Sequence, residues 1–145
     1  MEAVYFGTGY GGGGKGPWIG ADLEVGIYGG PYNASDTALR QPFVTAMIKG
    51  GTDGFAVKGG SAMSGGSLQK MYDGPRPEGY QPMRKAGAII LGVGGDNAKR
   101  DPAPDVQIPG MSIGTFYEGV LTVGYSTDAA DAAVQTNIVA AGYGK

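Results

Sequence analysis

The side chains that could do chemistry in this chain are carboxylates. The sequence holds 13 Asp and Glu residues but no histidine and no cysteine, so the usual neutral-pH acid–base residue and the thiolate nucleophile are both missing. Asp22 and Glu24 stand two residues apart in an alternating segment, which predicts that both point to the same face of a strand. Asp96 follows Gly94 and Gly95, which let a backbone approach a ligand closely. Proton chemistry here must therefore use carboxylates.

If the chain carries out proton transfer, these carboxylates are the candidate acid and base. A carboxylate pair on one strand face raises at least one pKa by repulsion between like charges. Spacing alone is also consistent with structural roles for these carboxylates. Glu24 can be an exposed strand carboxylate, and Asp96-Asn97 after two glycines is more often a turn than a general acid.

Composition favours an all-β fold and excludes several classes of protein. The 145 residues suffice for a single domain, 1–145, and the 30 glycines follow no three-residue period, which excludes collagen. So much glycine suits many short strands joined by tight turns. A net charge of −2 without a basic cluster disfavours nucleic acid as a partner, and no apolar run is long enough to cross a membrane.

The elements that must position the carboxylates are strands and the loops between them. Alternation and turn residues predict strands at Met1–Gly7, Pro17–Tyr28 as one or two strands bent at Gly26, Pro42–Lys49, Gly54–Lys58, Ala62–Tyr72 as an edge strand, Ala86–Val93 as the central strand, and Thr115–Tyr125. Thr52-Asp53-Gly54 predicts a hairpin turn. Loops are expected at 9–16, 31–41, 73–82 and 94–114.

A single helix is predicted at the end of the chain, over Thr127–Ala141. Thr127 is the expected cap, aspartates stand in the first turns, and Gly142 ends the helix. Ala130, Val134 and Ile138 share a face.

Several other side chains have a structural interpretation beside a functional one. Trp18, Tyr5 and Tyr10 could stack on sugar rings, but Trp18 between a proline and an isoleucine is expected in the core. Glu118 is expected in a cross-strand ion pair, with a sugar contact as the alternative. The basic side chains expected to be solvated are Lys49, Lys58, Arg76 and Arg84.

Three motifs, in order along the chain, carry a resemblance to a known family. The first is Gly16-Pro17-Trp18-Ile19 with Asp22-Leu23-Glu24, and the second runs from Ala86 to Gly94-Gly95-Asp96-Asn97. The third is Gly114-Thr115-Phe116-Tyr117-Glu118-Gly119-Val120, continuing to Val134–Ala141. Together they resemble the catalytic domain of the family 54 α-L-arabinofuranosidases, over Met1 to Tyr143.

The resemblance implies an activity and a role for particular residues. The family members are retaining exo-glycosidases with an antiparallel β-sandwich of concanavalin or jelly-roll type. They are extracellular enzymes acting on plant-type polysaccharide or oligosaccharide, and they release arabinofuranose from arabinan or arabinoxylan. The resemblance places the nucleophile at Glu24 and the acid/base at Asp96. Retaining hydrolysis needs two carboxyl groups about 5–5.5 Å apart, one ionised for attack and one protonated to release the leaving oxygen. It assigns substrate binding to Asp22, Gly95 and Asn97. No metal or organic cofactor is implied.

The chain also departs from the family pattern. Val25 replaces an asparagine that follows the nucleophile, and Thr8 stands where the family has a tryptophan. The likeness covers the second half of the family's catalytic domain, so the β-sandwich is expected to be incomplete, with a second chain or copies of itself as possible completing partners. The alternative function is therefore a catalytically degenerate relative that acts as a structural, self-assembling or glycan-binding module.

Overall fold

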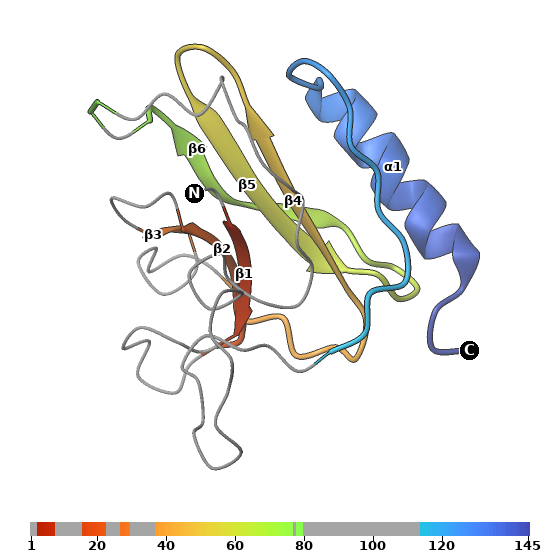
Figure 1. Ribbon diagram of the computed structural model, residues 1–145. Coiled ribbons are helices and arrows are strands. Elements are labelled where there is room, and N and C mark those ends of the chain that lie inside the picture. The colour runs from red at the N-terminus through yellow and green to blue at the C-terminus, as the bar shows by residue number, and fades with distance from the viewer. Residues whose placement is uncertain (1–2, 8–15, 23–26, 30–36, 77, 80–113) are drawn as a thin grey trace, which may run out of the picture.

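The computed structural model describes residues 3–7, 16–22, 27–29, 37–76, 78–79 and 114–145, and these form mostly strands (Figure 1). The elements are β1 (Ala3–Gly7), β2 (Trp18–Asp22), β3 (Ile27–Gly29), β4 (Val44–Gly50), β5 (Phe55–Ser61), β6 (Leu68–Gly74) and helix α1 (Asp128–Ala141). The predicted central strand Ala86–Val93 lies outside the described residues. In the described part of the chain, no helix is long and apolar enough to cross a membrane.

The strands form two antiparallel three-stranded sheets, ordered β1-β2-β3 and β4-β5-β6. The predicted β4–β5 hairpin is confirmed, since the Gly51 N–H donates to the Gly54 oxygen at 2.9 Å across the turn. The strand within Ala62–Tyr72 is confirmed as an edge strand of the described sheet, although β6 runs two residues further, to Gly74. The loop predicted at 73–82 therefore starts later than expected.

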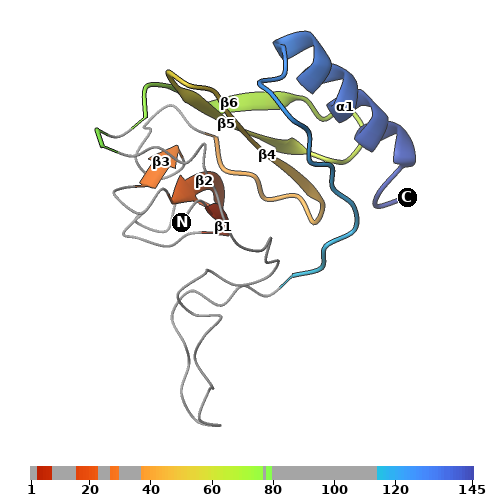
Figure 2. The same cartoon turned by 45° about the horizontal axis from the view of Figure 1, so that its top comes forward.

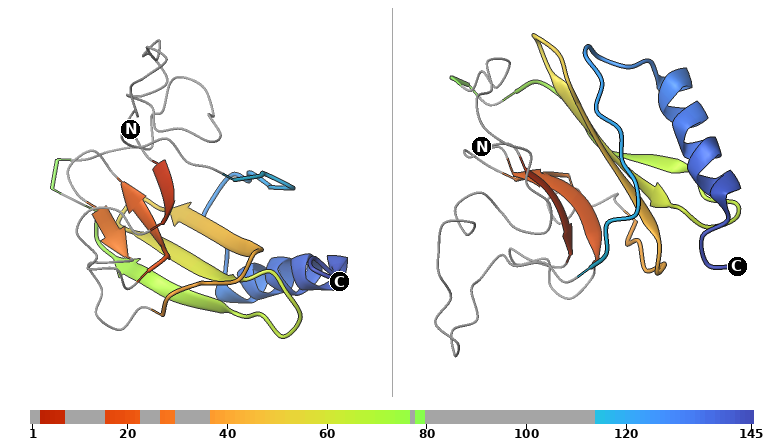
Figure 3. Two further views of the ribbon diagram at one scale, coloured as in Figure 1. Left: turned by 90° about the horizontal axis from the view of Figure 1, so that it is seen from below. Right: turned by 45° about the vertical axis from the view of Figure 1, so that its right-hand side comes forward.

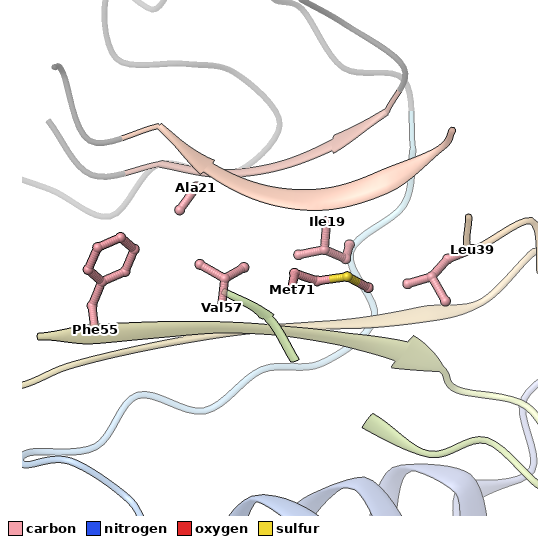
Figure 4. Close-up of a cluster of buried hydrophobic side chains, with 6 residues drawn as sticks. All are labelled: Ile19, Ala21, Leu39, Phe55, Val57 and Met71. Carbon is pink, nitrogen blue, oxygen red and sulfur yellow. The ribbon is translucent and has the colours of Figure 1, made fainter. Parts of the chain in front are cut away.

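The apolar core lies between the two sheets. Strands β1, β2 and β3 contact β4, β5 and β6 respectively. Figure 4 shows the side chains that meet there: Ile19 and Ala21 from β2, Phe55 and Val57 from β5, Met71 from β6, and Leu39. A Cβ at Gly59 would lie 2.6 Å from Cγ1 of Ile19, so the close approach of β5 to β2 requires glycine at that position. Trp18 is buried, as predicted for a core residue.

Helix α1 covers the opposite face of β4-β5-β6, which makes that sheet the middle layer (Figures 2 and 3). The predicted cap is confirmed, because the Thr127 hydroxyl accepts from the Ala130 N–H at 3.1 Å. The predicted end is confirmed as well, with Gly142 in the left-handed region at φ 80°. Of the three apolar residues that share a face, Ala130 is exposed, and Val134 and Ile138 are half-buried. The buried helical residues are Asp131 and Gln135, because the sheet face beneath the helix presents charge instead of apolar surface.

The strand predicted over Thr115–Tyr125 does not form. The segment runs beside β4: the rings of Tyr117 and Phe43 lie 5.4 Å apart, and the Lys49 amine lies 4.6 Å from the Tyr125 ring. None of the described backbone hydrogen bonds joins 114–125 to a strand, and a strand needs a ladder partner as well as alternation. The cross-strand ion pair predicted for Glu118 is wrong for the same reason. Its carboxylate instead accepts from the Tyr143 hydroxyl at 2.7 Å.

Candidate active site

The first motif carboxylate, Asp22, lies at the end of the middle strand of its sheet. Asp22 is paired with Ala3 of β1 and with Ile27 of β3, so neighbouring strands hold its backbone on both sides. The same strand is anchored by Ile19 and Ala21, which are fully buried against the middle sheet. Apolar residues early in β2 therefore fix the backbone position of Asp22, which follows them.

The other predicted site residues lie outside the described residues. Glu24 belongs to the four-residue connection, 23–26, that joins Asp22 of β2 to its pairing partner Ile27 of β3. Gly95, Asp96 and Asn97 fall within 80–113. The expected common strand face of Asp22 and Glu24 and the expected separation of Glu24 from Asp96 both remain predictions. Of the motif carboxylates, the structure gives a backbone position to Asp22 alone.

The charged side chains that the structure does bring together lie between α1 and the middle sheet. We call Lys49, Lys58, Asp128 and Asp131 the ionic cluster. The Lys49 amine donates to Asp131 at 2.7 Å and to Asp128 at 3.1 Å. The Lys58 amine donates to the same two carboxylates at 2.5 and 2.8 Å. Both lysines and Asp131 are buried, whereas the Asp128 side chain is 64% exposed.

Further hydrogen bonds surround the ionic cluster. The Ser126 hydroxyl donates to the second oxygen of Asp131, and the Ser126 carbonyl accepts from Lys49 at 2.9 Å. One turn along the helix, the Gln135 amide donates to the Ser61 carbonyl at 2.7 Å. These contacts join the start of α1 to β4 and β5, and they satisfy charges that would be costly to bury alone.

The pKa values of Lys49, Asp128 and Asp131 are shifted in the direction that favours their charged forms. Burial alone would lower the pKa of Lys49, but hydrogen bonds to Asp131 and Asp128 outweigh it and raise that pKa above 10.5. Burial likewise would raise the pKa of Asp131, yet the donors Lys49 and Lys58 hold it below 3.8. Hydrogen bonds from Lys58 and Lys49 also lower the pKa of the exposed Asp128. With two cations and two anions paired, the cluster offers no free base or nucleophile, and it docks the helix.

This cluster corrects the prediction that Lys49 and Lys58 are solvated, and the predicted exposure of Arg76 is also wrong. Arg76 is half-buried, and its side chain donates to the Gly51 carbonyl at 3.0 Å. Arg84 lies outside the described residues. A signal for the lysines was present in the sequence, since each stands within an apolar strand while the helix carries Asp128 and Asp131 one turn apart. Sequence reasoning missed it because the partners lie 70 to 82 residues apart.

An open hollow of about 270 Å³ lies beside the β4–β5 turn, a volume near the lower limit of small-molecule pockets. Asp53, Asp73 and Tyr125 line it together with glycines of the turn. Asp73 is paired with Lys70 at 2.9 Å. Across the described ranges, no group of three His, Cys, Asp or Glu side chains could hold a metal ion.

Comparison with known proteins identifies the family to which the candidate site belongs. Residues 1–144 match the family described as "Alpha-L-arabinofuranosidase B, catalytic". Over 99% of its length, the chain is 52% identical to an arabinofuranosidase/B-xylosidase of Trichoderma koningii and 50% identical to an alpha-L-arabinofuranosidase B of Emericella nidulans. It is 48% identical to the alpha-L-arabinofuranosidase B of Aspergillus niger. No solved structure matches the chain. The chain spans 28% of the length of each of these three relatives. The chain therefore belongs to the catalytic-domain family of α-L-arabinofuranosidase B.

Proposed function

We propose that this chain supplies the catalytic carboxylates of a retaining glycosidase that releases terminal α-L-arabinofuranose from arabinan or arabinoxylan. The observation that carries the proposal is the family match, which runs through residues 1–144 and so includes both carboxylate motifs. Relatives named as arabinofuranosidases share 48–52% of the residues over almost the whole chain. The substrate is accordingly a polysaccharide or oligosaccharide that carries arabinofuranose.

The proposed reaction proceeds in two steps and uses only carboxyl groups and water. The Glu24 carboxylate attacks the anomeric carbon while the Asp96 carboxyl gives its proton to the departing glycosidic oxygen, which leaves a covalent sugar–Glu24 ester. Asp96, now ionised, then takes a proton from water as the water oxygen attacks the same carbon and releases Glu24. Asp22, Gly95 and Asn97 hold the sugar ring.

The proposal extends to the fold and the location of the chain. We assign the two sheets to a β-sandwich of concanavalin or jelly-roll type, which is supported by the apolar core that β2 shares with β5 and β6. Because an arabinan or arabinoxylan chain is a polymer of the plant cell wall, the site of action is extracellular.

A chimera tests the role of Asp96. This chain replaces the matching segment, 28% of the length, of the Trichoderma koningii relative, and turnover is measured on arabinan and on an aryl α-L-arabinofuranoside. We expect Asp96→Asn to lower turnover on arabinan by at least about a hundredfold. The loss should be smaller on the aryl substrate, whose leaving group needs little protonation. Equal turnover by parent and variant on both substrates would remove Asp96 from the mechanism.

The departures from the family pattern favour a second candidate, a glycan-binding or structural module without turnover. Val25 cannot make the hydrogen bond of the family's asparagine, and Thr8 cannot offer the ring of the family's tryptophan. The same chimera separates the two functions. Binding of arabino-oligosaccharides without any release of arabinose favours the module, and release of arabinose favours the hydrolase.

A further inference from the structure

The hollow beside the β4–β5 turn combines an aromatic ring with several hydrogen-bond acceptors. Tyr125 contributes the ring, Thr52 contributes a hydroxyl, and Asp53 and Asp73 contribute carboxylates. A sugar carries C–H groups on the faces of its ring and hydroxyl groups around the rim. An aromatic side chain packs against the former, and carboxylates accept hydrogen bonds from the latter. At about 270 Å³ the hollow has room for a single small ligand.

Hydrogen bonds and close packing shape the hollow before any ligand arrives. The Gly51 N–H donates to the Gly54 oxygen at 2.9 Å, and the Arg76 side chain donates to the Gly51 carbonyl at 3.0 Å. A Cβ at Gly54 would lie 2.6 Å from the Gly74 oxygen, so the turn and the end of β6 approach closely because that residue is glycine. A preformed site loses little conformational entropy when it binds a ligand.

The Tyr125 ring is held in place and is still accessible. The Lys49 amine lies 4.6 Å from the centroid of the ring. On the side of the turn, the ring lies 3.3 Å from a Cβ built at Gly51. Tyr125 nevertheless remains 45% exposed. The ring can therefore contact a ligand without first changing its position.

Charge at the hollow favours a neutral ligand over an acidic one. A carboxylate can accept about four hydrogen bonds. Asp73 therefore keeps acceptor capacity beyond its bond from Lys70 at 2.9 Å, and Asp53 keeps it beyond its bond from Thr52 at 3.3 Å. Sugar hydroxyls can donate to these oxygens, whereas the carboxylate of a uronic acid would be repelled by them.

The hollow lies at the end of the two sheets to which Asp22 belongs. Figure 4 shows Ala21, the residue before Asp22, at the Phe55 end of the core, and Ile19 further along. Phe55 is the first residue of β5 and also lines the hollow. Strand β2 therefore runs toward the end of the molecule that carries the hollow, and Asp22 is its last residue.

We propose that this hollow binds one neutral sugar unit of an arabinose-carrying polysaccharide. Tyr125 packs against the sugar ring, and Asp53 and Asp73 accept hydrogen bonds from its hydroxyl groups. The class of ligand rests on the proposed function, and the site itself rests on the lining of the hollow. The hollow thus selects neutral arabinan or arabinoxylan and discriminates against polysaccharides rich in uronic acid.

Nuclear magnetic resonance of the isolated chain tests the site without any need for turnover. Arabinotriose is titrated into the labelled chain, and trigalacturonic acid is the acidic control. We expect the amide signals of Gly51, Thr52 and Gly74 to shift with arabinotriose while those of α1 stay in place. Trigalacturonic acid should bind at least about tenfold more weakly. Shifts that avoid the hollow, or equal binding of the two sugars, would overturn the proposal.

Variants of the lining show which side chains bind the sugar. Asp53→Ala should weaken arabinotriose binding at least about tenfold, and because Asp53 is exposed the variant should fold normally. Tyr125→Ala should weaken it as well, and Tyr125→Phe should recover most of the affinity because it keeps the ring. Glu78→Gln, at an exposed carboxylate outside the hollow, is the matched control and should bind as the parent does. Unchanged affinity of Asp53→Ala would contradict the proposal even if Tyr125→Ala proved unstable.

The outcomes also separate this site from the proposed catalysis. Arabinotriose binding at the hollow, together with a chimera that releases no arabinose, would support the site and reject the hydrolase. Release of arabinose by the chimera, with no signal at the hollow of the chain shifted by arabinotriose, would overturn the site and leave the hydrolase standing.

Discussion

The two faces of the middle sheet are held by different forces. One face packs Phe55, Val57 and Met71 against β2, with no charged side chain in the cluster. The other face presents Lys49 and Lys58 to the carboxylates of α1. Apolar contacts do not depend on pH, and they are not directional. Buried ions, in contrast, stabilise the fold only while every partner is present. The attachment of helix α1 to the sheet should therefore depend more on pH and on each charged partner than the packing of β2 against the other face does.

The largest expected effect comes from removing the shared carboxylate of the ionic cluster. Asp131→Ala leaves two buried lysines short of a partner, and we expect it to lower the free energy of unfolding by about 3–5 kcal/mol. Urea denaturation of the isolated chain measures the change. Asp53→Ala is the matched control, since Asp53 is exposed and its side chain accepts a hydrogen bond from the Thr52 hydroxyl. Equal stability of the two variants would show that the cluster does not dock the helix.

On the apolar face, Met71→Ala should lower the free energy of unfolding somewhat less than Asp131→Ala does. The Met71 side chain is fully buried in the core, and truncating such a residue lowers the free energy of unfolding by about 2–5 kcal/mol. The same urea titration measures it. Met71→Leu conserves volume and should cost less than about 1.5 kcal/mol. A small effect of both variants would mean that the two sheets are not joined through this core.

Variants of the two faces should change the curve of stability against pH in different ways. The pKa values of Asp131 and Asp128 are lowered in the folded state, so their contribution is present above 3.8 and is lost as pH falls through the lowered values. The pKa of Lys49 is raised, so its contribution is complete below 10.5 and is lost as pH rises through the raised value. Asp131→Asn should flatten the acid limb. Met71→Ala should lower the whole curve without changing its shape, and an unchanged acid limb in Asp131→Asn would contradict the cluster's role.

The smallest expected effect is at the start of the helix. Thr127→Ala removes the acceptor of the Ala130 N–H and should cost about 1 kcal/mol. Thr127→Ser keeps the hydroxyl and should recover most of that loss in the same denaturation experiment. If Ser and Ala behave alike at this position, the cap does not contribute to docking.

Local features of this fold could be predicted from the sequence, and features that need a distant partner could not. The β4–β5 hairpin and the bounds of α1 follow from turn and cap residues within each segment. The exposed state of 114–125 and the burial of Lys49 depend on groups far along the chain, which periodicity does not reveal. The alternation in Thr115–Tyr125 indicates a residue pattern that can pair, and pairing itself needs another strand.

The candidate site was predicted by a different route. Spacing alone left Glu24 and Asp96 as ordinary surface or turn carboxylates, and the ordered motifs of the family gave them roles. The match over residues 1–144 confirms the family, and the roles of the two residues stay predictions. In the described residues, the backbone of Asp22 at the end of β2 is the part of the site that the structure adds.

The most direct test of the proposed hydrolase is the turnover of the chimera after Glu24→Gln. We expect turnover of an aryl α-L-arabinofuranoside to fall by at least about a hundredfold, since an amide cannot form the covalent sugar ester. The thermal midpoint should be unchanged, and Glu78→Gln, at an exposed residue, should keep full activity. Undiminished turnover by a folded Glu24→Gln chimera would contradict the assignment of Glu24 as the nucleophile.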